Sequence, residues 1–167
     1  IMGVISGIFA ATGQTCIAGS RLLVQDSIYE KFVERLVKVA SEAKIGDPMS
    51  LDTHVGPVTT KPQFEKIMSY IDIAKSEGAK CLLGGKAYSG NDVKGNRFIE
   101  PTIFTDVNND MRIAQEEVFG PVLSIIRFKD EEESIKIGND VIFGLAAGVW
   151  TNDIGRALRM SDALRAG

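Results

Sequence analysis

One cysteine and its neighbours are the strongest candidates for chemistry in this chain. Cys16 lies in the run Phe9-Ala10-Ala11-Thr12-Gly13-Gln14-Thr15-Cys16-Ile17-Ala18-Gly19-Ser20-Arg21. The flanking glycines favour a short turn, because Gly13 can adopt φ > 0 and end a helix, and Gly19 permits a close backbone approach. Such a turn can leave a thiol at the mouth of a cleft, with backbone N–H groups directed at the group it attacks. The simpler interpretation is that Cys16 is a small buried apolar residue, as most free cysteines are.

A second run, about a hundred residues later, is Gln115-Glu116-Glu117-Val118-Phe119-Gly120-Pro121-Val122. By itself it fits a helix end with a solvated acidic pair, followed by a Gly-Pro turn into a strand. Together, the two runs resemble the NAD(P)-dependent aldehyde dehydrogenases, which have a Gly-Gln-x-Cys segment and a Glu-Glu-x-Phe-Gly-Pro box in this order. The resemblance to this family extends along the whole chain, because five further strings lie where the family has similar ones: Gly46-Asp47-Pro48, Val55-Gly56-Pro57, Glu77-Gly78-Ala79-Lys80, Phe98-Ile99-Glu100-Pro101-Thr102 and Phe143-Gly144-Leu145-Ala146-Ala147.

The resemblance implies a role for each matching residue. Cys16 would be the nucleophile, with its own backbone N–H as half of an oxyanion hole, and Thr15 and Ile17 would line the aldehyde pocket. Glu117 would bond the nicotinamide ribose, and Phe119 would pack near the nicotinamide ring. The thiol would add to an aldehyde to form a thiohemiacetal, which loses hydride to NAD or NADP and leaves a thioester for water to hydrolyse.

Other parts of the family pattern are absent. Three functional residues of the family have no match here: the general-base Glu of an upstream Glu-Leu-Gly-Gly string, the oxyanion-hole Asn and the lysine that contacts the adenosine ribose. The dinucleotide-binding pattern G-x-G-x-x-G does not occur either. The choice between NAD and NADP is therefore unreadable, and most of the cofactor would be bound by another domain. We expect residues 1–167 to be a catalytic, thiol-bearing domain cut at both ends, without nucleotide-binding and oligomerisation domains. The chain alone would then be inactive, and its full-length parent a homodimer or homotetramer.

Two alternatives stay open. One is an acylating aldehyde dehydrogenase that passes the acyl group to coenzyme A or phosphate, since such relatives differ mainly in the missing upstream base. The other is a non-catalytic structural or interaction fragment of the same fold. The sequence immediately upstream of Ile1 would separate these alternatives from the hydrolytic enzyme.

Composition excludes several other classes of function. The 167 residues suit one domain, and 44% hydrophobic with 25% charged residues is a globular balance. The net charge of −3 and pI near 5.3 predict neither nucleic-acid nor anionic-membrane binding. No apolar run approaches the ~20 residues of a membrane span. Two cysteines and one histidine predict no disulfide framework, no metal site and, by default, a reducing cytoplasmic compartment.

Helical and strand patterns alternate along the chain. We predict helices over 3–12, 26–43, 60–77, 109–115, 131–140 and 152–164, with Thr60 and Asp130 opening two of them. We predict strands over 21–25, 80–83, 122–128 and 145–150, a mostly extended segment over 98–105, and a surface loop over 84–97. Cys81 falls in an apolar strand and is assigned to the core. This alternation predicts an α/β fold with an open, mostly parallel twisted sheet flanked by helices, of the aldehyde dehydrogenase catalytic-domain type.

Overall fold

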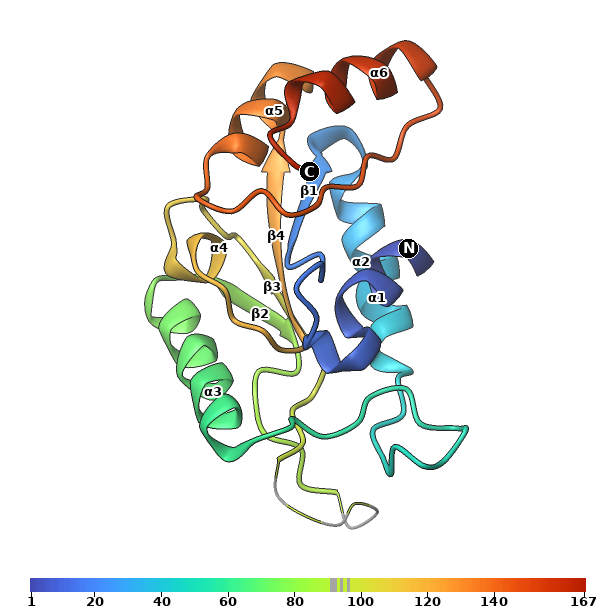
Figure 1. The fold of residues 1–167 in the computed structure, drawn as a ribbon, viewed down its shortest axis with the longest axis vertical. Coiled ribbons are helices and arrows are strands. Elements are labelled where there is room, and N and C mark those ends of the chain that lie inside the picture. Colours follow the sequence, from blue (N-terminus) through green and yellow to red (C-terminus); the bar gives the residue numbers. More distant parts are fainter. Residues whose placement is uncertain (91–92, 94, 96) are drawn as a thin grey trace.

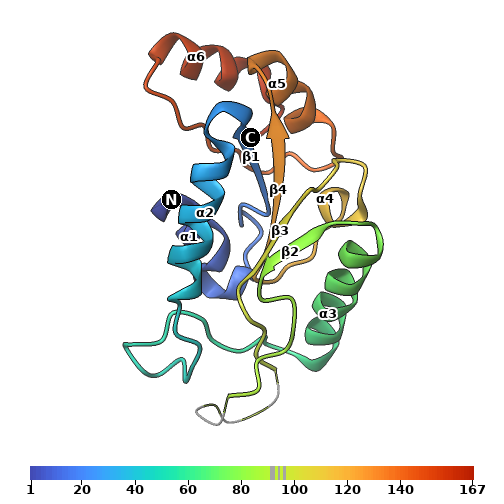
Figure 2. The same cartoon turned by 180° about the vertical axis from the view of Figure 1, so that it is seen from behind.

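The computed structural model describes residues 1–90, 93, 95 and 97–167, which form helices on both faces of one sheet (Figures 1 and 2). Part of the loop predicted over 84–97 lies outside the described residues. The elements, in chain order, are α1 (Met2–Phe9), the 3₁₀ turn η1 (Ala10–Gly13), β1 (Arg21–Gln25), the 3₁₀ turn η2 (Asp26–Ile28), α2 (Tyr29–Ser41), α3 (Lys61–Ser76), β2 (Lys80–Leu83), β3 (Thr102–Thr105), α4 (Arg112–Gln115), β4 (Val122–Phe128), α5 (Glu131–Asn139) and α6 (Ile154–Ala163).

The sheet has the strand order β1-β4-β3-β2 (Figure 1). The β1–β4 and β3–β4 pairs are parallel, and only the β2–β3 pair is antiparallel. Arg21 of β1 lies opposite Ser124 of β4, and Thr102 of β3 lies opposite Val122. The amino ends of β1, β3 and β4 therefore lie at the same end of the sheet. The predicted open, mostly parallel α/β sheet is confirmed.

Alternation along β4 explains how both faces of the sheet are buried. Leu123 and Ile125 pack into the hydrophobic cluster that contains α1 and α2, whereas Val122 and Ile126 pack into the cluster that contains α3 and α4. Successive strand side chains point to opposite faces, so one apolar run serves two cores. Figures 1 and 2 show α1 and α2 on one side of the sheet and α3 and α4 on the other.

Local sequence accounts for the ends of two helices. The Thr60 hydroxyl accepts a hydrogen bond from the backbone N–H of Gln63 (3.3 Å), and the Asp130 carboxylate accepts one from that of Glu133 (2.9 Å). Glu133 returns the interaction, because its carboxylate accepts from the N–H of Lys129 (2.7 Å). Such side chains satisfy amides that the first helical turn leaves without partners, so both helix starts are readable from sequence.

The strand predicted over 145–150 is wrong. Residues 140–153 join α5 to α6 as irregular chain, and Leu145 and Trp150 are 54% and 80% exposed. A strand exists only where a neighbouring strand supplies hydrogen bonds, and an apolar pattern does not say whether that neighbour is present. Other helix boundaries differ by a few residues: the last helix begins at Ile154, capped by Asp153, rather than at 152. No helix in the described part of the chain is long and apolar enough to cross a membrane.

Candidate active site

The loop that carries Cys16 begins with three consecutive left-handed residues. Ala11, Thr12 and Gly13 have φ values of 49°, 59° and 67°. Glycine adopts this conformation freely, but alanine and β-branched threonine adopt it rarely, so their surroundings must hold them there. The buried Thr12 hydroxyl supplies one such restraint by donating to the carbonyl of Gly56 (3.2 Å).

Gln14 fastens the same loop to the segment before α3. Its Oε1 accepts hydrogen bonds from the backbone N–H (2.9 Å) and the hydroxyl (3.0 Å) of Thr59. Its Nε2 donates to the carbonyls of Pro57 and Ala11, both at 3.4 Å. The Gln14 amide is thus used in full to fix the backbone two residues before the cysteine.

Cys16 lies in a turn that follows this fixed base. Thr15, Cys16 and Ile17 are all exposed, Ile17 to 69%. The N–H of Ala18 donates to the carbonyl of Thr15 (3.1 Å), and the N–H of Gly19 returns the chain to α1 by donating to the carbonyl of Gly7 (2.9 Å). Cys16 is therefore a surface thiol on a turn held at both ends, which contradicts the interpretation of a buried apolar cysteine.

The two sequence motifs meet at a pair of glycines. A Cβ atom added to Gly13 would lie 2.1 Å from the carbonyl oxygen of Gly120, so only glycine fits there. At Gly19 the backbone also approaches another segment, because its N–H bonds the carbonyl of Gly7, but an added Cβ would lie 4.0 Å from that oxygen and meet no other atom closer, so this contact does not require glycine. The motifs meet because each leads into one of two neighbouring parallel strands, β1 and β4, whose amino ends lie at the same end of the sheet.

The second motif, residues 115–120, is held by Gln63 of α3. Gln63 Nε2 donates to the carbonyls of Val118 (2.9 Å) and Phe119 (3.0 Å). Phe119 is half-buried and has φ = 57°, so it is a third non-glycine residue, after Ala11 and Thr12, that is held in the left-handed region near the glycine contact. Glu117, in contrast, is exposed, and its carboxylate has no hydrogen-bond or ion-pair partner among the described residues. A carboxylate free of internal partners fits the hydroxyls of a ribose, which are hydrogen-bond donors.

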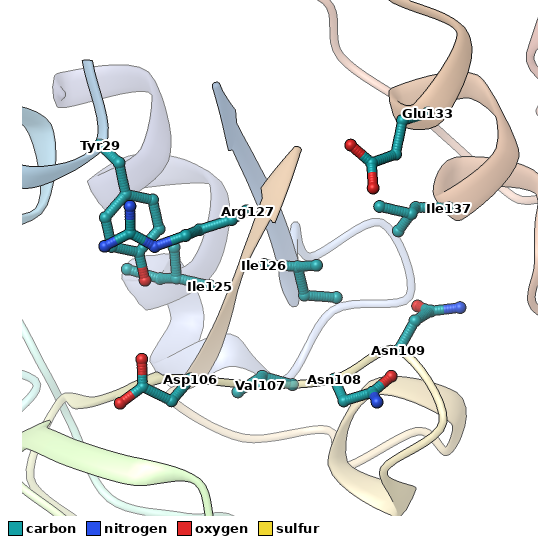
Figure 3. Close-up of a pocket in the computed structure, with 10 residues that line it drawn as sticks. All are labelled: Tyr29, Asp106, Val107, Asn108, Asn109, Ile125, Ile126, Arg127, Glu133 and Ile137. Carbon is teal, nitrogen blue, oxygen red and sulfur yellow. The ribbon is translucent and has the colours of Figure 1, made fainter. Parts of the chain in front are cut away.

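A separate cavity of about 370 Å³ lies toward the opposite end of β4 (Figure 3). Its lining includes none of the predicted site residues. Tyr29 stacks under the guanidinium of Arg127 (3.5 Å from the ring centroid), and Glu133 and Asn109 make hydrogen bonds within the protein. The cavity therefore belongs to the packing between β4, α2 and α5. Among the described residues, no group of three His, Cys, Asp or Glu side chains could hold a metal ion.

Comparison with known proteins identifies the family. The sequence matches the aldehyde dehydrogenase family over residues 1–167. The chain belongs to this family. It is 50% identical to an aldehyde dehydrogenase of Aspergillus niger over 161 residues, and 47% identical to a betaine aldehyde dehydrogenase of Mesorhizobium japonicum over 167 residues. These alignments cover 96% and 100% of this chain but 32% and 34% of the relatives, so the chain spans about a third of their length.

Solved structures agree with the family assignment. A crystal structure of betaine aldehyde dehydrogenase from Staphylococcus aureus in complex with NAD+ superposes with a TM-score of 0.97 and 43% identity. That superposition covers 99% of this chain and 33% of the solved one. A related structure of the same enzyme contains NAD+ and a BME-modified cysteine. The fold predicted from sequence is therefore that of aldehyde dehydrogenases.

Sequence reasoning did not identify the residues that hold the site. Gln14 lies inside the first motif but had no assigned role, and Gln63 was only part of a predicted helix. Both side chains form hydrogen bonds with backbone groups that are 43 to 56 residues away in the sequence. Local pattern carries no signal for such contacts. The roles of Cys16, Thr15, Ile17, Glu117 and Phe119 remain predictions.

Proposed function

We propose that the protein containing this chain oxidises an aldehyde to a carboxylic acid with NAD or NADP, using Cys16 as the nucleophile. The contact of Gly13 with Gly120 is the observation that carries the proposal. It joins the loop of an exposed thiol to the loop of an exposed, unpartnered carboxylate, Glu117. Neither motif by itself implies that the other lies close to it in the fold, so their contact is independent support for one shared site. Because the chain spans a third of its relatives, the complete activity is a proposal about the longer protein.

The chemistry follows from the thiol and its turn. The thiolate form of Cys16, whose proton has been lost to solvent or a base, adds through Sγ to the aldehyde carbon, and the backbone N–H of Cys16 stabilises the oxyanion of the resulting thiohemiacetal. A nicotinamide cofactor held by Glu117 and Phe119 would supply the acceptor for the hydride that leaves that carbon. Loss of hydride leaves a thioester on Cys16, and attack by water, with transfer of one water proton to a base, releases the acid and restores the thiolate. The base that takes the proton of this water has no counterpart among the matched residues of this chain.

Glu117 and Phe119 fit the cofactor role. Glu117 offers two free oxygens to the ribose hydroxyls, and Phe119 is an aromatic residue on a backbone fixed by Gln63. The NAD+ complex of the S. aureus relative supports the same cofactor class. Thr15 and Ile17 border the thiol, and the exposed apolar side chain of Ile17 suits an apolar or mid-sized aldehyde.

The test compares two cysteine variants in the complete protein. A panel of aldehydes is supplied with NAD or NADP, and reduced nicotinamide is followed by its near-ultraviolet absorbance. Cys16→Ser is expected to abolish turnover, and the matched variant Cys81→Ser is expected to retain it. Turnover that survives Cys16→Ser would contradict the assignment. Formation of an acyl-coenzyme A when coenzyme A is added would favour the acylating alternative, and absence of turnover with every aldehyde would favour a non-catalytic role.

We further infer a homodimeric or homotetrameric, cytoplasmic parent protein. Exposed apolar side chains between α5 and α6 and on α6 support self-association: Ile142, Phe143, Leu145, Trp150, Ile154 and Leu158. Two free cysteines agree with a reducing compartment. Light scattering of the purified complete protein measures the oligomeric state, and a monomer would contradict this inference.

A further inference from the structure

Two adjacent glutamates in the second motif have opposite surroundings. Glu117 is exposed and free of partners, whereas both oxygens of Glu116 are occupied. Glu116 Oε1 accepts from Arg112 Nε (2.7 Å), and Oε2 accepts from Arg112 Nη2 (2.9 Å) and from the hydroxyl of Tyr70 (2.5 Å). Glu116 therefore has little capacity left for a ligand, although it has the same chemistry as its neighbour.

The partners of Glu116 come from two helices that pack against each other. Arg112 begins α4, and its backbone N–H donates to the carboxylate of Glu77 at the end of α3 (3.0 Å). Its guanidinium also lies 5.6 Å from the centroid of the Tyr70 ring, which belongs to α3. Figure 1 shows the short helix α4 beside α3. Glu116 thus ties the residue directly after α4 to a long helix anchored in the core.

The surrounding residues of the motif are restrained as well. Gln115 Nε2 donates to the carbonyls of Asn109 (2.7 Å) and Asp140 (2.8 Å). Val118 is buried, Gln63 holds the carbonyls of Val118 and Phe119, and Gly120 abuts Gly13. Glu117 is the one side chain between residues 115 and 119 that is left exposed, on a backbone fixed before and after it.

We propose that Glu116 is a positioning residue, held by Arg112 and Tyr70, that sets the direction of the Glu117 carboxylate toward the nicotinamide ribose. The inference rests on the proposed function, because it needs Glu117 to contact the cofactor. An exposed ion pair adds little to stability, and the side chains of Arg112 and Glu116 are 50% and 39% exposed. A bidentate pair with a third partner nevertheless fixes geometry, because two parallel N–H···O bonds allow one orientation.

The pKa values of Glu116 and Tyr70 are consistent with a Glu116 carboxylate that stays ionised at neutral pH. The hydrogen bonds from Arg112, and then that from Tyr70, lower the pKa of Glu116 to about 2. The hydrogen bond to this carboxylate, followed by burial, raises the pKa of Tyr70. Tyr70 therefore stays protonated and donating while Glu116 stays charged across the neutral range.

The test uses the complete protein with Glu116→Gln and Tyr70→Phe, which keep the size of the side chain and the aromatic ring. Glu131→Gln is the matched control, because Glu131 is held by Arg156 and Arg159 between α5 and α6 and its pKa is also lowered to about 2. Without cofactor, backbone amides 117–120 are expected to exchange hydrogen faster in the two test variants and unchanged in the control. Unchanged exchange in Glu116→Gln would overturn the proposal.

A second measurement asks whether Glu116 acts through Glu117. Single-turnover hydride transfer with prebound NAD is expected to slow roughly fivefold in Glu116→Gln, with little change in the Kd for NAD. The same substitution in a Glu117→Gln background should have almost no further effect, because the group it positions is gone. An equal slowing in both backgrounds would overturn the proposal. If no aldehyde is turned over, the proposed function fails and with it the direction of Glu117 toward a ribose, whereas the exchange measurement still decides whether Glu116 fixes the backbone of residues 117–120.

Discussion

Gly13→Ala tests the contact that joins the two motifs. The new methyl group would lie 2.1 Å from the carbonyl oxygen of Gly120, 2.4 Å from its carbon and 2.9 Å from the nitrogen of Pro121. All three are backbone atoms, so no side chain can rotate away. Either the loop of Cys16 or the start of β4 must move, and β4 is paired with strands on both sides.

Two costs add at this position. A non-glycine residue at φ = 67° costs roughly 1–2 kcal/mol, and forcing packed atoms apart costs roughly 1–3 kcal/mol. The free energy of unfolding should therefore fall by about 2–5 kcal/mol, a large part of the roughly 5–15 kcal/mol of a typical domain. Gly78→Ala is the matched control, because Gly78 also has positive φ (98°) but nothing within 4 Å of an added Cβ.

Urea unfolding of the complete protein, with hydrogen exchange of peptides from residues 8–25 and 115–128, measures the effect in this domain. The control should lose only the conformational part, about 1–2 kcal/mol. The excess loss in Gly13→Ala is the steric part, and both motifs should become less protected together. Equal destabilisation by the two substitutions, or loss of protection in one motif only, would refute the reasoning.

Three further outcomes are expected. Iodoacetamide at neutral pH should label Cys16 before Cys81, because Cys16 is exposed whereas burial raises the pKa of the half-buried Cys81; mass mapping that finds Cys81 first would contradict this. The pKa of Glu116 is about 2 in the folded protein against an ordinary 4.5, so the small stabilisation that this partly exposed carboxylate contributes is complete above pH 4.5 and is lost as the pH falls toward 2. The stability difference between wild type and Glu116→Gln should shrink over that range, and a constant difference would refute the linkage. The 167-residue chain alone should show no turnover with any aldehyde and NAD or NADP, because it holds the thiol without a matched base or dinucleotide motif; steady turnover lost in Cys16→Ser would disprove it.

Sequence alone determined the local features and the two motifs. The start of α3 at Thr60 and of α5 at Asp130 follows from side chains that bond amides three residues away. The apolar run of β4 indicated a buried parallel strand, because a strand covered on both faces carries apolar residues at nearly every position. The types and order of residues around Cys16 and Glu117 indicated the family, which the comparisons then confirmed. These signals are readable because each depends on a few consecutive residues.

Tertiary structure decided which distant segments of the chain contact each other. Strand order brought Gly13 against Gly120, and Gln14, Gln63 and Glu116 each bond groups more than 40 residues away. Apolar pattern predicted a strand at 145–150, but the described structure supplies no neighbouring strand to pair with it. Hydrogen bonds between distant segments depend on the packing of whole helices and strands, and no local pattern encodes that packing. The sequence therefore named the thiol and the carboxylate, and only the fold showed how their backbones are held together.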